Sequence, residues 1–73
     1  MKHERISVNP AVLGGKPCIN GTRISVEHIL RELSAGTSMD ELLAAHPHIV
    51  REDILAALAY AADSLSLEDI VLA

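Results

Sequence analysis

The sequence predicts a single, mainly α domain in which three helices follow a short N-terminal β-hairpin or ribbon. Its 73 residues suffice for one domain and no more. Apolar residues recur at helical spacing over residues 26–65, whereas residues 1–25 alternate short extended stretches with Gly, Pro and Asn turn signals. Residues 66–73 form an apolar tail. The chain has no Phe, no Trp and one Tyr, so its core must be built from Leu, Ile, Val and Ala.

The first 25 residues predict two short strands separated by turns. Residues 5–8 alternate polar and apolar side chains, as a strand does, and residues 23–25 are expected to form the second strand. Residues 18–19 are expected to be extended. Proline has no backbone N–H to donate within a β-ladder, and an Asn-Gly pair readily adopts the positive φ of a tight turn. We therefore expect the extended stretches to end at such turn signals. These signals are Asn9-Pro10, Gly14-Gly15-Lys16-Pro17 and Asn20-Gly21.

Two capped helices are expected next. In the first, Ser25 is a candidate N-cap and Gly36 marks the end. Its apolar face consists of Val26, Ile29, Leu30 and Leu33. In the second, Ser38 and Glu41 have the spacing of a capping box, and Pro47 ends the helix because it pushes the preceding residue out of helical geometry. The second apolar face consists of Met39, Leu42 and Leu43.

The third helix is predicted from Arg51 to Leu65, with more apolar surface than two neighbouring helices can bury. One stripe consists of Ile54, Leu58, Ala61 and Leu65, and the next of Leu55, Ala59 and Ala62. Ser66 with Asp69 has the spacing to cap a last short helix. This surplus of apolar surface indicates that the chain forms a homodimer or binds a partner protein. The alternative is that the apolar tail, residues 66–73, folds back and completes the core. The candidate interface residues are Ile6, Val8, Leu55, Ala59, Leu65, Leu67, Ile70 and Leu72.

Charge is distributed unevenly along the chain. Residues 1–23 hold four basic side chains and one acidic one, a net charge of +3. Residues 24–73 hold two arginines and nine acidic side chains, a net charge of −7, which brings the total to −4. A polyanion such as DNA should therefore meet the first third of the chain. The alternative is that this basic third pairs with the acidic remainder of its own fold.

No arrangement of residues predicts a catalytic or metal site, so we expect no enzyme activity, cofactor or metal. Gly14-Gly15-Lys16 lacks the earlier glycine and the following Ser or Thr of a phosphate-binding loop. His46 and His48 have no third ligand at a recognised spacing. Cys18 lies in an apolar context, which favours a buried thiol. A lone cysteine, no signal-like N-terminus and no run of ~18 apolar residues predict a cytoplasmic protein without membrane association.

The second and third predicted helices have the layout of a helix–turn–helix. A short helix, a turn of about five residues and a longer helix follow one another, and the longer helix of such a unit can enter the major groove of DNA. Arg51, at the start of the third helix, is placed to reach a base or a phosphate. Glu52 and Asp53 beside it would repel the DNA backbone, since phosphate neutralisation supplies most non-specific affinity.

Over residues 6–62 the sequence resembles the domain-of-unknown-function 433 family. The opening signature is Asn9-Pro10, Leu13-Gly14-Gly15-Lys16-Pro17-Cys18-Ile19, Gly21-Thr22-Arg23-Ile24 and Val26. The match continues with Gly36, Ser38, Glu41, Leu42, Pro47, Asp53-Ile54 and Ala57-Leu58-Ala59-Tyr60-Ala61. The resemblance implies a small bacterial or archaeal cytosolic protein with a homeodomain-like helix–turn–helix, dimeric through an N-terminal β element. Members are similar to VapB-type antitoxins and often neighbour a PIN-like ribonuclease toxin.

One position departs from the family pattern. Val50 stands where members usually have Thr or Ser before the third helix. We therefore expect that helix to lack an N-cap worth about 1 kcal/mol and to fray at its start.

These features together predict a dimeric DNA-binding antitoxin or small transcriptional regulator of a type II toxin–antitoxin pair. The candidate DNA-binding residues are Lys16, Arg23 and Arg51, although Arg23 could instead pair with a downstream acid. The apolar end, residues 65–73, would dock on a PIN-like toxin, whose metal-binding ribonuclease site would be plugged by Arg23, Arg31 or Arg51. Two alternatives stay open: a protein-interaction adaptor without DNA binding, and a small hydrolase that uses Cys18 and a histidine.

Overall fold

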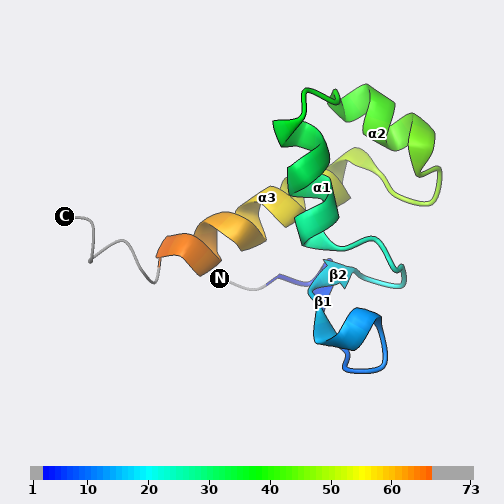
Figure 1. Ribbon diagram of the computed structural model, residues 1–73. Helices are drawn as coiled ribbons and strands as arrows, with labels where there is room; N and C mark the ends of the chain where they lie inside the picture. The colour runs from blue at the N-terminus through cyan, green and yellow to red at the C-terminus, as the bar shows by residue number, and fades with distance from the viewer. Residues whose placement is uncertain (1–2, 67–73) are drawn as a thin grey trace.

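Three helices pack above a two-stranded antiparallel sheet (Figure 1). The structure is a computed structural model, and it describes residues 3–66. The elements in chain order are β1 (Ile6–Ser7), a 3₁₀ turn (Leu13–Gly15), β2 (Cys18–Ile19), α1 (Val26–Ser34), α2 (Met39–Ala45) and α3 (Arg51–Ser66). α1 crosses α3, α2 lies at one end of that crossing, and the sheet lies at the other (Figure 1). The mainly helical architecture is the one that the sequence predicted.

The sheet differs in part from the predicted hairpin. β1 is confined to Ile6–Ser7, shorter than the expected residues 5–8, and it pairs with β2, with Ile6 opposite Ile19 and Ser7 opposite Cys18. The second strand was expected at residues 23–25, which form no strand: Ser25 makes an isolated bridge to Cys18, and the Ile24 carbonyl oxygen accepts from the Ile19 N–H. The reason is the tight turn after β2. Ile24 donates to the Thr22 hydroxyl, which in turn donates to the Ile19 carbonyl oxygen.

The Gly14-Gly15 segment is a turn former, as the sequence predicted. Leu13, Gly14 and Gly15 have φ values of 48°, 66° and 91°, in the left-handed region that glycine adopts without steric cost. Leu13 is the only non-glycine residue with positive φ among residues 3–66. Its side chain is 45% exposed, so the turn presents an apolar residue to solvent.

The predicted caps of α1 and α2 are confirmed. The Ser25 hydroxyl accepts from the His28 backbone N–H at 2.9 Å. At α2 the capping box is complete: Ser38 Oγ accepts from the Glu41 N–H, and Glu41 Oε1 accepts from the Ser38 N–H. That second bond holds the pKa of the Glu41 carboxyl below its ordinary value. Each cap satisfies a backbone donor that the helix itself leaves free.

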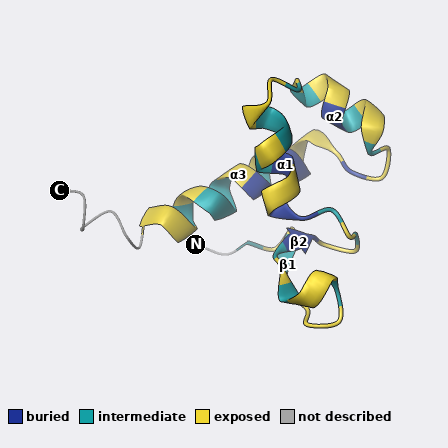
Figure 2. Ribbon diagram, viewed as in Figure 1, coloured by how far each residue is buried: buried dark blue, intermediate teal, exposed yellow. Residues whose placement is uncertain are grey.

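The core is aliphatic and lies where α1, α2 and α3 meet (Figure 2). Its buried members are Ile19, Val26, Ile29, Leu42, Ile49, Ile54 and Ala57. The structure buries Ile54 and Ala57 of α3, whereas Leu58 and Leu65, which share the predicted stripe of Ile54, are 38% and 64% exposed. The α1–α3 crossing selects the face centred on Ala57, because its methyl group admits the close approach of the two helices.

Asp53 holds the start of α3, which begins at Arg51 as the sequence predicted. Asp53 Oδ2 accepts from the Val50 N–H at 3.0 Å, so the third residue of the helix makes the half of a capping box that does not need an N-cap hydroxyl. Its Oδ1 accepts from Arg5 Nη1, also at 3.0 Å. The carboxylate therefore satisfies the Val50 N–H and ties the turn before β1 to α3. The predicted last helix, capped by Ser66 and Asp69, lies outside the described residues beyond Ser66, and Ser66 belongs to α3.

Asp53→Ala should destabilise the fold by ~2 kcal/mol, because it frees the Val50 N–H and the Arg5 guanidinium at once. The half-exposed Arg5 contributes the smaller share, since solvent screens its charge. Urea unfolding followed by circular dichroism measures the change. Glu52→Ala is the matched control, with an expected effect within about 0.5 kcal/mol. Equal losses for the two variants would contradict the role given to Asp53.

Candidate interaction surfaces

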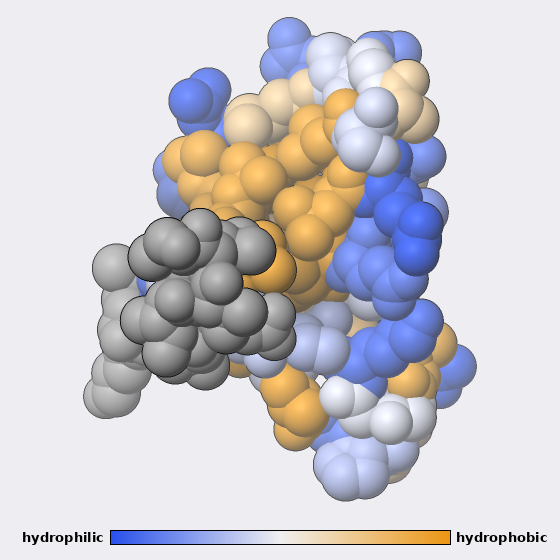
Figure 3. Space-filling view, turned by 60° about the vertical axis from the view of Figure 1, so that its left-hand side comes forward, coloured by the Kyte–Doolittle hydropathy of each residue, from blue (hydrophilic) through white to orange (hydrophobic). Residues whose placement is uncertain are grey.

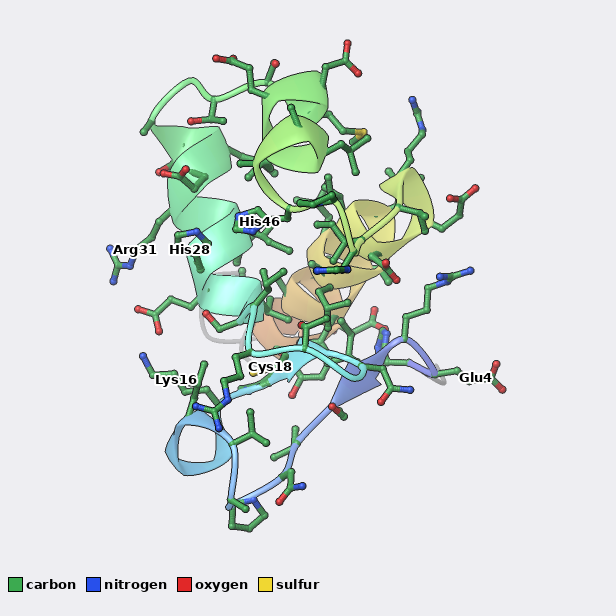
Figure 4. All side chains as sticks on the ribbon, turned by 90° about the vertical axis from the view of Figure 1, so that its right-hand side faces the viewer. Glu4, Lys16, Cys18, His28, Arg31 and His46 are labelled. Carbon is green, nitrogen blue, oxygen red and sulfur yellow. The ribbon has the colours of Figure 1, made fainter. Side chains whose placement is uncertain are left out.

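Lys16, the first candidate DNA contact, lies in a charge cluster at the start of α1. Glu27 accepts from Lys16 Nζ at 3.0 Å and from Arg31 Nη2 at 3.0 Å. The Lys16 ammonium, followed by the Arg31 guanidinium, holds the pKa of the Glu27 carboxyl below its ordinary value. Figure 4 places Lys16, His28 and Arg31 on one side of the molecule and Glu4 on the opposite side. The cluster keeps one net positive charge, because two cations share one carboxylate.

Arg23 and Arg51 are exposed and lie on separate elements. Arg23 lines a hollow of about 490 Å³ between the strand β1 and the turn after β2, with polar neighbours Ser7, Asn9, Asn20 and Thr22. Arg51 is the first residue of α3. Neither arginine makes an ion pair within residues 3–66. The alternative prediction, that Arg23 pairs with a downstream acidic side chain, therefore has no support in that part of the chain. The hollow at Arg23 shares no lining residue with the smaller one at Lys16.

An apolar groove of about 310 Å³ runs between the start of α1 and the last turns of α3. Its walls are almost entirely apolar, with a carboxylate and a hydroxyl at the rim. The lining residues are Pro17, Val26, Glu27, Leu30, Tyr60, Ala61, Ser64 and Leu65. Figure 3 faces the side of the molecule on which α3 ends, and it shows a broad hydrophobic area there. The groove exists because α3 extends beyond the part of it that α1 covers.

The candidate interface residues divide into three groups. Val8, Leu55 and Leu65 are exposed, at 59%, 43% and 64%, and Ala59 is half-buried. Ile6 packs against the core and pairs with Ile19, so it serves the fold of one chain. The remaining three, Leu67, Ile70 and Leu72, lie outside the described residues.

A contact that the sequence did not reveal joins the N-terminus to α3. His3 Nε2 lies 2.8 Å from Asp63 Oδ2, and the His3 ring packs edge-on against Tyr60 with centroids 5.2 Å apart. That carboxylate oxygen is buried and receives no well-aligned hydrogen bond from the described residues. Three contacts join the basic N-terminal third to acidic side chains of the helices: His3–Asp63, Arg5–Asp53 and Lys16–Glu27. The alternative interpretation of the charge pattern expected such internal pairing.

Cys18, His28 and His46 make contacts within the fold. Cys18 is buried, and its thiol donates to the Lys16 carbonyl oxygen at 3.2 Å. His28 and His46 pack edge to face with ring centroids 5.7 Å apart. Within residues 3–66, no three His, Cys, Asp or Glu side chains are grouped as metal ligands would be. Over the same residues, no helix has the length and apolar character to cross a membrane.

The fold and its surfaces define a small helical domain that carries an apolar groove and two arginines without ion pairs among residues 3–66. The chain belongs to the family described as protein of unknown function DUF433, whose model matches residues 6–61. It is 36% identical over 58 residues to "Uncharacterized protein y4eO" of Sinorhizobium fredii, covering 80% of this chain and 26% of that protein. A crystal structure of a DUF433 member from Anabaena variabilis superposes with a TM-score of 0.81 at 34% identity, over 89% of this chain and 64% of that one. The chain therefore spans about a quarter of the curated relative that it matches.

The charge cluster predicts a specific response to acid. The pKa of Glu27 is lowered in the folded chain, so the unfolded chain takes up the proton first as pH falls. The stability that the cluster contributes is present above the ordinary carboxyl value of 4.5 and is lost as pH falls through the lowered pKa. Thermal melts between about pH 5 and pH 3 should thus show a shallower decline in Tm for Glu27→Gln than for the wild type. A decline as steep as that of the wild type would contradict this, and Glu52→Gln is the control.

Proposed function

We propose that this protein is the antitoxin of a type II toxin–antitoxin pair, a dimer that binds a PIN-like ribonuclease toxin and operator DNA. The observation that carries the proposal is the apolar groove between α1 and α3, because an exposed apolar concavity on so small a domain is suited to a protein ligand. The family resemblance supplies the kind of partner. Fold analogy alone is a weak warrant for function, so each binding step needs its own argument and test.

The toxin-binding step uses the groove for affinity and an arginine for inhibition. An apolar helix or strand of the toxin would fill the space between Leu30 and Tyr60. Arg23 and Arg51 are the better candidates to plug an acidic metal-binding ribonuclease site, because neither is engaged by an ion pair in residues 3–66. Arg31 is a weaker candidate, since Glu27 already accepts from its guanidinium.

The DNA-binding step uses α2, the turn after it and α3 as a homeodomain-like helix–turn–helix. The first turn of α3 would enter the major groove of the operator and present Arg51 to it. The acidity of that turn is partly offset, because Arg5 and the Val50 N–H both bind the Asp53 carboxylate. Arg23 and Lys16 would contact phosphates from the N-terminal third.

An adaptor that binds protein but not DNA is the second candidate function. It is favoured by the ion pairs of Arg5 and Lys16, which use much of the basic charge internally, and by the exposed Glu52 beside Arg51. The two candidates share the groove and differ in the expected affinity for duplex DNA.

Ser64→Arg should weaken binding of the proposed PIN-like toxin by at least roughly tenfold, because it places a long charged side chain in the groove. Ser66→Arg, two residues further along α3 and outside the groove, is the matched control and should bind as the wild type does. Calorimetric titration measures both affinities, and a ribonuclease assay reports inhibition. Equal affinities for the two variants would rule out the groove as the toxin site.

Binding to the operator duplex should weaken steeply with salt, since Lys and Arg displace counterions from phosphate. The double variant Lys16→Ala with Arg23→Ala should lower both the affinity and the slope of log Kd against log salt, the slope by about two. Fluorescence anisotropy at a series of salt concentrations measures this, with Arg31→Ala as the control. An unchanged slope would remove the basic third from the DNA face. Absence of duplex binding at low salt would favour the adaptor.

A further inference from the structure

One face of α3 carries an apolar stripe that the core does not use. Leu55, Leu58, Ala62 and Leu65 are all exposed, and the three leucines retain 43%, 38% and 64% of their accessible surface. Their spacing of three, four and three residues is the heptad spacing of a coiled-coil seam. The stripe lies beside the core face of α3, which is centred on Ala57, and it meets the apolar groove only at Leu65.

We propose that a second copy of this chain covers the stripe, with the two α3 helices antiparallel. A heptad seam is matched by another helix with the same seam, and one that is complementary to itself closes as a twofold dimer. In the antiparallel register centred on the stripe, Leu55 lies opposite Leu65 of the second copy, and Leu58 lies opposite Ala62. Each small side chain thus faces a large one, so the helices can approach closely along two heptads.

Charge selects the antiparallel arrangement. Arg51 precedes Leu55 by four residues, so it continues the same stripe at the N-terminal end of α3. An antiparallel neighbour places this arginine at the C-terminal end of the other α3, where helix carbonyl groups carry partial negative charge. A parallel neighbour would instead bring the two Arg51 side chains and the two positive helix ends together. The arrangement gives Arg51 the partner that residues 3–66 do not provide.

This inference rests on the dimeric part of the proposed function and makes it specific, and it replaces the part in which the first turn of α3 presents Arg51 to the major groove. It assigns self-association to α3, whereas the family resemblance implies a dimer built on the N-terminal β element, where Val8 is exposed. The groove between α1 and α3 stays available to the toxin on the neighbouring flank of the helix. Arg51 then serves the dimer, and Arg23 becomes the main candidate for DNA contact or ribonuclease inhibition.

Sedimentation velocity of the full chain, over roughly two decades of concentration, tests the surface. The wild type should show a concentration-dependent dimer, Leu58→Glu should be monomeric throughout, and Val8→Glu should dimerise as the wild type does. Far-ultraviolet circular dichroism confirms that each variant is folded, and Ala62→Glu provides a second disruption of the stripe. A wild type that stays monomeric, a dimeric folded Leu58→Glu, or a dimer lost in Val8→Glu would each overturn the proposal.

Disulfide trapping tests the orientation. In a Cys18→Ala background, Leu55→Cys and Leu65→Cys proteins of different mass are mixed under mild oxidation. The antiparallel pair predicts the mixed disulfide as the main product, whereas a parallel pair predicts the two homodisulfides and would overturn the proposal. The toxin-binding assay separates this inference from the proposed function. A monomeric wild type that still binds toxin refutes only the α3 dimer, and a trapped antiparallel dimer that binds neither toxin nor DNA refutes only the antitoxin function.

Discussion

The small volume of the aliphatic core constrains most of what this structure presents to its surroundings. Seven buried side chains form the core cluster of the described residues, and none of them is aromatic. A core of that size covers one face of α3, yet α3 has 16 residues and extends about 24 Å. The rest of its apolar surface is left as a groove beside α1 and as a stripe on the neighbouring flank. Both candidate protein-binding surfaces follow from this mismatch between helix length and core size.

Internal ion pairs decide how much of the positive charge is available to an anionic ligand. Arg5 is bound by Asp53, and Lys16 shares Glu27 with Arg31. These pairs join the basic N-terminal third to the acidic helices, so the net charge of +3 calculated for residues 1–23 overstates the charge that DNA would meet. The pairs at Glu27 are exposed and screened by solvent, and they contribute modestly to stability. Their functional consequence is larger: they leave Arg23 and Arg51 as the arginines without ion pairs among the described residues.

The features that depend on residues close together in the sequence were the most predictable. The caps at Ser25 and Ser38 join groups three residues apart, and the end of α2 before Pro47 depends on the proline ring alone, so local chemistry determines them. The bounds of α1, α2 and α3 follow from apolar spacing for the same reason. The family membership could likewise be predicted from the opening signature, which is a continuous pattern of turn formers and apolar residues.

The amino-acid order therefore determined the helices, their caps, the turn at Gly14-Gly15 and the surplus of apolar surface, because each depends on neighbours within a few residues. Packing decided which face of α3 is buried, because Ile54 and Ala57 join the core cluster while Leu55 and Leu58, one from each predicted stripe, stay exposed. It also decided that β2 rather than residues 23–25 pairs with β1. The Arg5–Asp53 contact spans 48 positions, and no local pattern encodes a pairing over such a distance. Folding brings that arginine to a carboxylate that had been expected only to complement the helix dipole and that also accepts from the nearby Val50 N–H.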